Sequence, residues 1–462
     1  MSLLSEWFNR KSKIVNRKLP VVNPKSGLFH YVRETANEKS RIHLRIDPDG
    51  TGTLIVNASS VMHLNPTAAL MAYLILEKVD EEQAVKTIHQ KYRVNKSQAH
   101  ADYSSFILHL SSLFTDACPI HELDLETTMP FSARPSAPYR MDLAVTYRCN
   151  NDCAHCYNAR ERDFPELTTD QWKKIIDQLW VLGVPHIVFT GGEATLRNDL
   201  PELIRHAENN GQITGLNTNA RRLADMNYVQ QLVDAGLDHV QITVESCVPD
   251  IHDEMMRAKG AFKQTIAGLQ NVLATKLYVM TNTTMLRTNV HTIPATLDFL
   301  ADTGVPTIGL NALILSGQGL TVGTGLRESE LQPILDIATQ KTAARGQKLI
   351  WYTPTQYCEF DPTANNLGVK GCTAALYSMC IESNGDVLPC QSYYHPLGNM
   401  LTDSWDSIWN HKLSTQLRER QNLPFKCETC TLLPECGGGC PLQFENHREQ
   451  SGVNLPVLSQ NL

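Results

Sequence analysis

The chain has 462 residues and 42% of them are hydrophobic, which is enough for two or three domains with cores of their own. The net charge of −7 argues against a protein that binds nucleic acid by neutralising its phosphates. No apolar run reaches the roughly 20 residues that span a bilayer, and the basic N-terminal residues lack the apolar segment of a secretory signal. We therefore expect a soluble, cytoplasmic protein that uses neither nucleic acid nor a membrane, with residues 1–27 as a solvated or basic amphipathic arm.

The residues from 28 to 118 are expected to form a small sheet followed by three helices. Alternating apolar residues predict strands over 42–46 and 54–56, and apolar residues at helical spacing predict helices over 66–76, from about 81, and over 103–114. Asn65 followed by Pro66 is a typical helix start. This order predicts a winged-helix-like module, and the prolines over 119–138 indicate a linker.

Residues 139–350 alternate between predicted strands and helices. The strands are expected at 141–147, 186–190, 212–217, 238–244, 277–284 and 307–313. Thr168 and Gln171 fit a capping box at the start of the first helix between them. Since such alternation implies a parallel sheet with right-handed crossovers, we expect an α/β fold. Its form would be an open, partial (β/α)6 barrel with active groups at the carboxyl ends of the strands.

Thirteen cysteines in a long chain without an export signal favour metal or redox use over disulfides. Cys149, Cys153 and Cys156 follow the first predicted barrel strand in a C-x3-C-x2-C loop. Three thiolates can hold three irons of a 4Fe–4S cluster and leave the fourth iron for another ligand. The alternative is a structural zinc site completed by His155, although such sites usually have paired C-x2-C motifs.

This loop and its position resemble those of the radical S-adenosylmethionine (SAM) superfamily, and further motifs match in chain order. The resemblance implies that the three loop cysteines are catalytic and hold the cluster that binds SAM. In that family the Gly-Gly-Glu segment lies against the methionine part of SAM. The residues that the resemblance assigns to SAM are Tyr157, Gly191, Gly192, Glu193, Asn217, Thr243, Glu245 and Arg257, with Asn219 as a further pocket candidate.

The same resemblance implies a mechanism. The reduced cluster cleaves SAM, and the resulting 5′-deoxyadenosyl radical abstracts a hydrogen atom from a substrate. The cofactor supplies this chemistry, while the protein supplies orientation and excludes water. A flavodoxin- or ferredoxin-type protein is expected as the electron donor.

Eight further cysteines lie in residues 351–462, which show little periodicity and are expected to fold around metal. Six of them form two motifs: Cys372 with Cys390, and the C-x2-C-x5-C-x3-C run of Cys427, Cys430, Cys436 and Cys440. Alone, these motifs fit zinc and iron–sulfur equally well. With the upstream loop they resemble the SPASM extension of radical SAM enzymes, which binds two auxiliary clusters. The resemblance therefore implies three 4Fe–4S clusters and SAM.

The family's auxiliary ligands interleave. The resemblance assigns Cys372, Cys390 and Cys440 to auxiliary cluster I, with Cys358 or Cys380 as a fourth ligand. It assigns Cys427, Cys430 and Cys436 to auxiliary cluster II. The family pattern ends with one more cysteine, which this chain lacks, so an open position, His447, a carboxylate and Cys380 are the alternatives. Cys118 and Cys247 have no partners by spacing and are expected to be small buried hydrophobic residues.

Residues 28–118 resemble the PqqD-like peptide-binding domain known as the RiPP recognition element, in their order of strands, short helix and terminal amphipathic helix. The resemblance implies that the leader of a precursor peptide adds a strand to an exposed sheet edge. Tethering the leader would raise the effective concentration of the core peptide. The alternative is a structural or dimerising winged helix.

Together these features predict a radical SAM oxidoreductase, a peptide maturase, that abstracts hydrogen from a ribosomally made precursor and forms a thioether or carbon–carbon cross-link. The alternatives within this class are epimerisation, backbone excision, and oxidation of a protein Cys or Ser as in sulfatase maturation. An alternative from another class is a non-catalytic zinc protein that binds peptide or nucleic acid.

Overall fold

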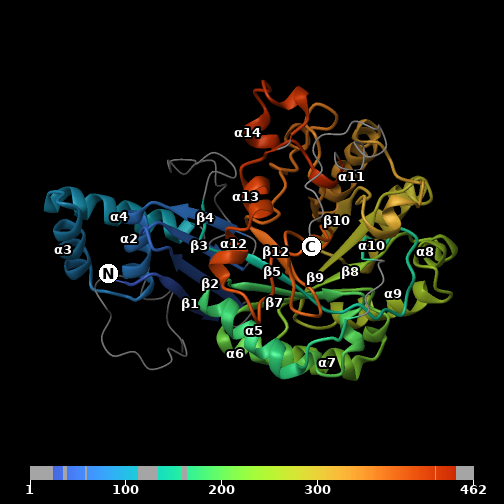
Figure 1. Ribbon diagram of the computed structural model, residues 1–462, viewed down its shortest axis with the longest axis horizontal. Coiled ribbons are helices and arrows are strands. Elements are labelled where there is room, and N and C mark those ends of the chain that lie inside the picture. The colour runs from blue at the N-terminus through green and yellow to red at the C-terminus, as the bar shows by residue number, and fades with distance from the viewer. Residues whose placement is uncertain are drawn as a thin grey trace. The chain divides into compact units, whose positions relative to one another are not determined.

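The computed structural model describes residues 24–34, 39–57, 60–112, 134–158, 164–421 and 423–443. Most of the predicted arm and linker, together with Cys118 and His447, lie outside these residues. The chain divides into two compact units, one built mainly from residues before 128 and one from residues after 137. Figure 1 labels the helices and strands of both units.

The N-terminal unit is an antiparallel sheet followed by three helices. The strands, in the sheet order β1-β2-β3-β4, are β1 (Gly27–Glu34), β2 (Lys39–Ile46), β3 (Gly52–Val56) and β4 (Ser60–Leu64). The helices are α2 (Pro66–Leu76), α3 (Glu81–Tyr92) and α4 (Lys96–Ser112). The predicted strands and helices are confirmed, whereas the edge strands β1 and β4 were not predicted. The winged-helix-like assignment stays a prediction.

Helix α2 is the centre of this unit's core. Its first turn forms as the sequence predicts, because the Asn65 side chain accepts a hydrogen bond from the backbone N–H of Ala68 at 2.9 Å and Pro66 follows the cap. The helix is apolar on all sides and buried from Ala69 to Leu76, since it contacts the sheet as well as α3 and α4. Tyr103 and Phe106 of α4 complete the core, as their spacing predicts.

The second unit is built on one sheet. Its strands are β5 (Arg140–Thr146), β6 (His186–Gly191), β7 (Ile213–Thr218), β8 (His239–Thr243), β9 (Tyr278–Thr284), β10 (Thr307–Asn311), β11 (Lys348–Trp351), β12 (Ser378–Ile381) and β13 (Val387–Leu388). They lie in the order β11-β10-β9-β8-β7-β6-β5-β12-β13, and all pairings except β12 with β13 are parallel. The six predicted strands, β5 to β10, are confirmed.

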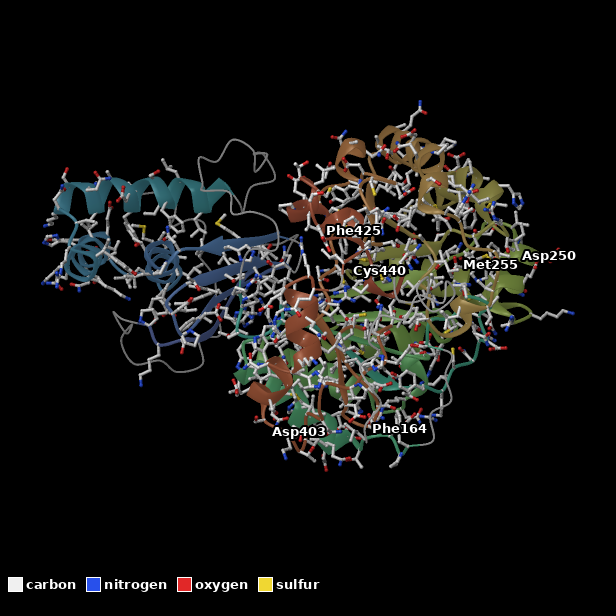
Figure 2. The ribbon with its side chains drawn as sticks, turned by 45° about the horizontal axis from the view of Figure 1, so that its top comes forward. Phe164, Asp250, Met255, Asp403, Phe425 and Cys440 are labelled. Carbon is white, nitrogen blue, oxygen red and sulfur yellow. The ribbon has the colours of Figure 1, made fainter. Side chains whose placement is uncertain are left out.

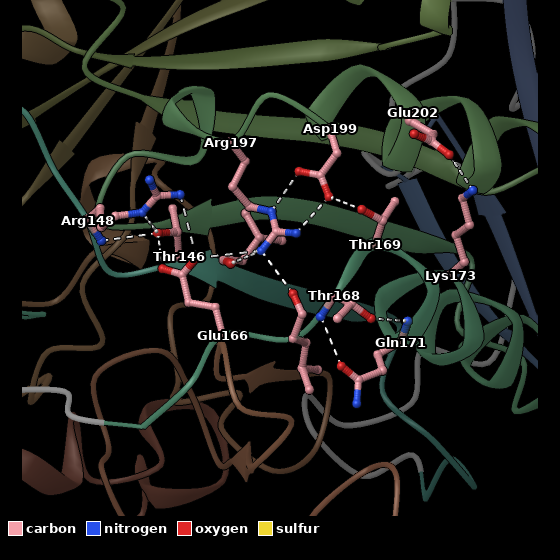
Figure 3. A network of polar contacts seen from close by, with 12 residues as sticks. Thr146, Arg148, Glu166, Thr168, Thr169, Gln171, Lys173, Arg197, Asp199 and Glu202 are labelled. Carbon is pink, nitrogen blue, oxygen red and sulfur yellow. Dashed lines mark hydrogen bonds and ion pairs between the residues drawn. The ribbon is translucent and has the colours of Figure 1, made fainter.

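Helices connect the parallel strands and continue into the C-terminal segment. They are α5 (Thr169–Val181), α6 (Leu200–Asn210), α7 (Met226–Ala235), α8 (Pro249–Met256), α9 (Ala261–Leu273), α10 (Ile293–Thr303), α11 (Gln332–Ala344), α12 (Trp405–Trp409), α13 (Lys412–Arg418) and α14 (Leu433–Cys436). The capping box at α5 is confirmed: the backbone N–H of Thr168 donates to Oε1 of Gln171 at 2.9 Å, and the N–H of Gln171 donates to Oγ1 of Thr168 at 3.3 Å (Figure 3).

The C-terminal segment also contributes to the sheet. Strand β12 pairs in parallel with the first barrel strand, placing Met379 opposite Met141 and Cys380 opposite Asp142. Cys380 is 1% exposed and packs with Ala144 and Leu388. Part of this segment therefore completes the sheet that carries the first cysteine loop, which the sequence did not predict, whereas its folding around metal stays a prediction.

Two neighbouring histidines on the sheet predict a pH dependence of stability. Nε2 of His239 lies 2.8 Å from Nε2 of His186, and burial together with the charge of Arg140 lowers the pKa of His239 to about 4. The unfolded chain binds this proton below about pH 6.5 and the folded chain does not. The free energy of unfolding of the metal-free protein should therefore fall by on the order of 1–3 kcal/mol between pH 6.5 and 4.

Thermal unfolding across this pH range, compared with a His239→Gln variant, checks the expectation. The variant should show a shallower decline than the parent chain. Equal declines would show that other groups cause the effect.

Among the helices of the described ranges, none combines the length and the apolar character needed to cross a membrane.

Candidate active site

The first cysteine loop begins at the carboxyl end of β5, where a parallel α/β sheet usually places its active groups. Cys149, Cys153 and Cys156, called here the first thiol set, are free thiols that line a cavity of about 810 Å³. Burial raises the pKa of Cys153 well above the usual range, and the neighbouring Cys156 and Cys149 raise it further. The three sulfur atoms are thus close enough for their charges to interact.

The start of the loop is fastened to β6. The backbone N–H of Gly192 donates to the carbonyl of Thr146 at 2.8 Å, and that of Glu193 donates to the carbonyl of Arg148 at 2.9 Å. A Cβ atom on Gly191 would lie 2.0 Å from the Thr146 oxygen, and one on Gly192 would lie 2.5 Å from the Arg148 oxygen. Glycine is therefore required at both positions, since no side chain fits between the strand ends.

Charged side chains hold the outer side of the same turn (Figure 3). Glu166 accepts a hydrogen bond from the Thr146 hydroxyl and lies 3.6 Å from the Arg148 guanidinium. Arg197 donates two hydrogen bonds to Asp199, at 2.9 and 2.7 Å, and a third to the carbonyl of Val145. This network fixes the backbone immediately before Cys149.

The second half of the loop is held from α8 and β8. The N–H of Ala154 donates to the carbonyl of Met255 at 2.9 Å (Met255 is labelled in Figure 2). Nε2 of His155 lies 2.9 Å from Oε1 of Glu245, which is fully buried. The other carboxylate oxygen of Glu245 accepts from the N–H of Thr284 at 2.7 Å. Glu245 therefore ties the cysteine loop to β9, and His155 is oriented by this carboxylate.

Glu193 also has a structural role in this arrangement. Its carboxylate accepts hydrogen bonds from Oγ1 and N of Thr195, Oγ1 of Thr218 and N of Asn219. It is 1% exposed and burial raises its pKa, although these hydrogen bonds lower it. Gly191 and Gly192 line the cavity, whereas Glu193 does not. The structure thus gives Glu193 a positioning role, and its assignment to SAM stays a prediction.

Replacing Glu193 by alanine should lower the free energy of unfolding by about 2–4 kcal/mol, because two backbone N–H groups and two hydroxyls lose a buried acceptor. Thermal unfolding measures this loss. Glu202→Ala, which removes an exposed partner of Lys173, is the control and should change stability by less than about 1 kcal/mol. Equal stability of the two variants, with a raised KM for SAM in Glu193→Ala, would instead indicate direct contact with SAM.

Five of the other residues that the sequence assigns to SAM share the cavity. They are Tyr157, Asn217, Thr243 and Glu245, together with the further candidate Asn219. Arg257 is outside the cavity lining: it caps the end of α8 in a left-handed conformation and lies 3.7 Å from exposed Asp152. Its predicted contact with the SAM carboxylate stays a prediction.

Several polar residues of the cavity were not predicted from the sequence. Gln241, Asn282, Thr284 and Asn311 line it from three adjacent strands. Gln241 with Thr243, and Asn282 with Thr284, are two residues apart, the spacing that puts side chains on one face of a strand. Polar residues at alternate positions of otherwise buried parallel strands could have identified them.

A second thiol set, Cys372, Cys390 and Cys440, lines the same cavity (Cys440 is labelled in Figure 2). Burial raises the pKa of Cys390 to about 12, and the neighbouring Cys372 contributes. Burial also raises the pKa of Cys440, and the neighbouring thiols of Cys372 and Cys390 raise it further. These cysteines come together as predicted, whereas buried Cys380 does not line the cavity.

A third thiol set, Cys427, Cys430 and Cys436, lies elsewhere in the C-terminal segment. Cys358 lies near this set. Burial raises the pKa of Cys427 and that of Cys436, and the neighbouring Cys358 thiol raises both pKa values further. Cys358 does not line the cavity that holds the second set. The expectation that Cys358 joins the second set is therefore not supported by the geometry.

The donor chemistry of these sets fits iron–sulfur clusters. All their sulfur atoms are free thiols, and thiolates are the usual ligands of 4Fe–4S clusters. Within the described residues, no three His, Cys, Asp or Glu side chains converge closely enough to hold one metal ion. A four-iron cluster is larger than one ion and needs no such convergence.

Family comparisons agree with this geometry. Residues 143–300 match the model of the radical SAM superfamily, and residues 372–431 match SPASM, an iron-sulfur cluster-binding domain. The chain contains a radical SAM domain and a SPASM domain. It is therefore related to radical SAM enzymes whose chemistry uses a 4Fe–4S cluster and SAM, with additional clusters bound by the SPASM domain.

Curated relatives include a synthase and a maturase. The radical SAM–SPASM chain is 28% identical to Fe-coproporphyrin III synthase of Methanosarcina barkeri, over 65% of this chain and 82% of that protein. It is 28% identical to the mycofactocin maturase MftC of Mycobacterium ulcerans, over 70% of this chain and 91% of that protein.

A solved structure shares the fold over more of the chain. Streptococcus suis SuiB bound to its precursor peptide SuiA matches with a TM-score of 0.65 and 17% identity, over 87% of this chain and 95% of SuiB. Residues 137–462 make up less than three quarters of the chain, so this match extends into the residues before 137.

Proposed function

We propose that this radical SAM–SPASM protein is a peptide maturase that modifies a ribosomally made precursor. One observation supports the proposal most strongly: the first and second thiol sets line a single cavity of about 810 Å³. A substrate in that cavity would lie between the site of radical generation and a second metal group. A peptide loop or side chain fits such a space, which is within the size range of ligand pockets.

The first thiol set would hold the 4Fe–4S cluster that binds SAM, and the second and third sets would hold two auxiliary clusters. When bound, the first cluster and SAM together supply the 5′-deoxyadenosyl radical that abstracts a hydrogen atom. A flavodoxin- or ferredoxin-type donor would provide the electron.

The chain's own residues bind and orient the reactants. Gly191 and Gly192 leave backbone groups at the cavity wall where no side chain intervenes. Asn217 and Thr243 offer hydrogen-bonding side chains on neighbouring strands. Glu193 and Glu245 act as positioning residues, because they hold the surrounding backbone. Burial of this wall also excludes water from the reacting groups.

The N-terminal unit would bind the leader of the precursor, as a PqqD-like element. Its sheet has two edge strands, β1 and β4, and either can accept an added strand through backbone hydrogen bonds. Val61 on β4 is an exposed apolar residue at such an edge. The fold match with peptide-bound SuiB, which extends before residue 137, supports this role. The proposed domain limits are 28–118, 139–350 and 351–462.

The bond formed is proposed to be a side-chain cross-link, thioether or carbon–carbon. Removing a hydrogen atom and joining two groups leaves one electron to be accepted, and the second thiol set would place an electron acceptor beside the substrate. Epimerisation, excision and sulfatase-type oxidation are the alternatives.

A second candidate is modification of an iron porphyrin. The relative Fe-coproporphyrin III synthase favours it, since that protein matches this chain as well as MftC does in percentage identity. The N-terminal unit and the match to peptide-bound SuiB favour the peptide.

The test is incubation of the reconstituted protein with SAM, dithionite and either a short peptide encoded beside its gene or an iron porphyrin that is a precursor of Fe-coproporphyrin III. A peptide product lighter by two hydrogen atoms is expected, read by mass spectrometry. Consumption of the porphyrin without change in the peptide would contradict the proposal. An unchanged peptide mass with deuterium incorporated from heavy water would replace cross-linking by epimerisation.

A further inference from the structure

Cys358 lies beside the third thiol set although it is far from that set in the sequence. It follows β11, in a segment that packs on α14 and the residues after it. The backbone N–H of Tyr357 donates to Sγ of Cys436 at 3.4 Å, and that thiol donates to the carbonyl of Thr355 at 3.7 Å. A Cβ atom on Gly439 would lie 3.2 Å from the backbone nitrogen of Gln356. The two segments are therefore in direct contact.

The four thiols interact electrostatically as one group. Burial raises the pKa of Cys427, and the thiols of Cys436, Cys358 and Cys430 raise it further. Cys436 is affected in the same way by Cys358 and Cys430. Thiolates gathered so closely repel one another, and positively charged metal would relieve this repulsion.

The remaining cysteines of the described chain are accounted for elsewhere. The first and second thiol sets line the cavity, and Cys380 is buried in the sheet beside Leu388. Cys247 follows β8, where its N–H donates to Oγ1 of Thr296. The cysteine run gives the third set three members, and residues 441–462 contain no cysteine.

We infer that Cys358 supplies the fourth thiolate of the iron–sulfur cluster held by Cys427, Cys430 and Cys436. This inference rests on the cofactor set proposed above. It gives the third set four cysteines, the number that closes the ligand shell of a 4Fe–4S cluster. Such a cluster has no iron free to bind a substrate or SAM, so it transfers electrons or stabilises the fold.

With Cys358 as a ligand, this cluster would also cross-link two segments of the chain and stabilise the fold. Ligation by Cys358 joins the segment after β11 to the C-terminal cysteines, and the loop so closed contains Cys372 and Cys390 of the second set. Because metal binding energy contributes to folding, the closed loop should hold these two cavity-lining cysteines in place. Loss of Cys358 should then lower the thermal stability of the loaded protein.

Alkylation of the unmodified chain tests the inference directly. Cys358 is exposed, so N-ethylmaleimide should modify it in metal-free protein. In the reconstituted protein Cys358 should be protected together with the third thiol set, as read by peptide mass spectrometry. Cys247 is the comparison thiol and should react equally in both forms.

Two outcomes would overturn the inference and can be told apart. If the third thiol set is protected while Cys358 reacts fully, a cluster is present and Cys358 is not its ligand. If neither is protected while the other sets are, the proposed cofactor itself is absent from this site.

A Cys358→Ala variant, with Cys247→Ala as its matched control, gives a second readout. The variant should lose about one to four irons per chain and change the low-temperature EPR spectrum of the auxiliary clusters, because one iron of the cluster loses its thiolate ligand. Iron content and spectrum equal to those of the control would contradict the assignment. If the variant does not fold, the alkylation pattern of the parent chain decides.

Discussion

Replacing Cys149, Cys153 and Cys156 together by alanine should abolish the formation of 5′-deoxyadenosine from SAM. These thiols line the cavity at the end of β5 and would provide every protein ligand of the SAM-binding cluster. The second and third thiol sets lie on the C-terminal segment, so iron should fall from about twelve to about eight per chain rather than to zero. Deoxyadenosine by chromatography and iron by colorimetry measure the two effects.

The matched control is the Cys372→Ala, Cys390→Ala variant. It removes two thiols from the same cavity but leaves the first thiol set intact. This control should still cleave SAM and should fail to give the peptide product. Persistence of SAM cleavage in the triple variant would show that the radical is generated elsewhere.

Replacing Glu245 by alanine should lower SAM cleavage by about 10–100-fold, the usual cost of removing a residue that orients a metal-binding loop. Glu245 is buried, lies 2.9 Å from His155 of the cysteine loop, and accepts a hydrogen bond from Thr284. Without this carboxylate the loop loses its attachment to β8 and β9. Iron of the first cluster should therefore be lost before iron of the auxiliary clusters.

The mechanism of this effect can be separated from direct SAM binding. His155→Phe should have a similar effect, and the double variant should be little worse than either single one, because both changes break the same contact. Glu254→Gln, an exposed change on α8, is the control and should be nearly silent. A raised KM for SAM with full iron in Glu245→Ala would instead show that Glu245 contacts SAM.

The strands and helices that the sequence predicted are those with strong local patterns. The apolar pattern of β5 to β10 and the capping box of Thr168 and Gln171 each involve residues that are close in the sequence. The sequence alone therefore predicts where these elements lie. Strands β12 and β13 have only four and two residues, and β12 is defined by its pairing with distant β5. No local pattern indicates such a pairing.

The residues of the site divide in the same way, into those predictable from sequence spacing and those placed by contacts between remote segments. The C-x3-C-x2-C loop and the glycines after β6 were recognisable from spacing. The orientation of Glu193 was not, because it is set by Thr218 at the end of β7 and by Asn219 directly after it. The grouping of Cys358 with the third thiol set depends on the packing of two segments that are remote in the sequence.

The central claim is that the first thiol set forms the site at which SAM is reductively cleaved. The most direct measurement is the yield of 5′-deoxyadenosine and methionine from SAM after anaerobic reconstitution with iron and sulfide and reduction by dithionite. The account predicts equal amounts of both products, formed only when reductant is present. Protein that holds its full iron content and still yields no deoxyadenosine would contradict it.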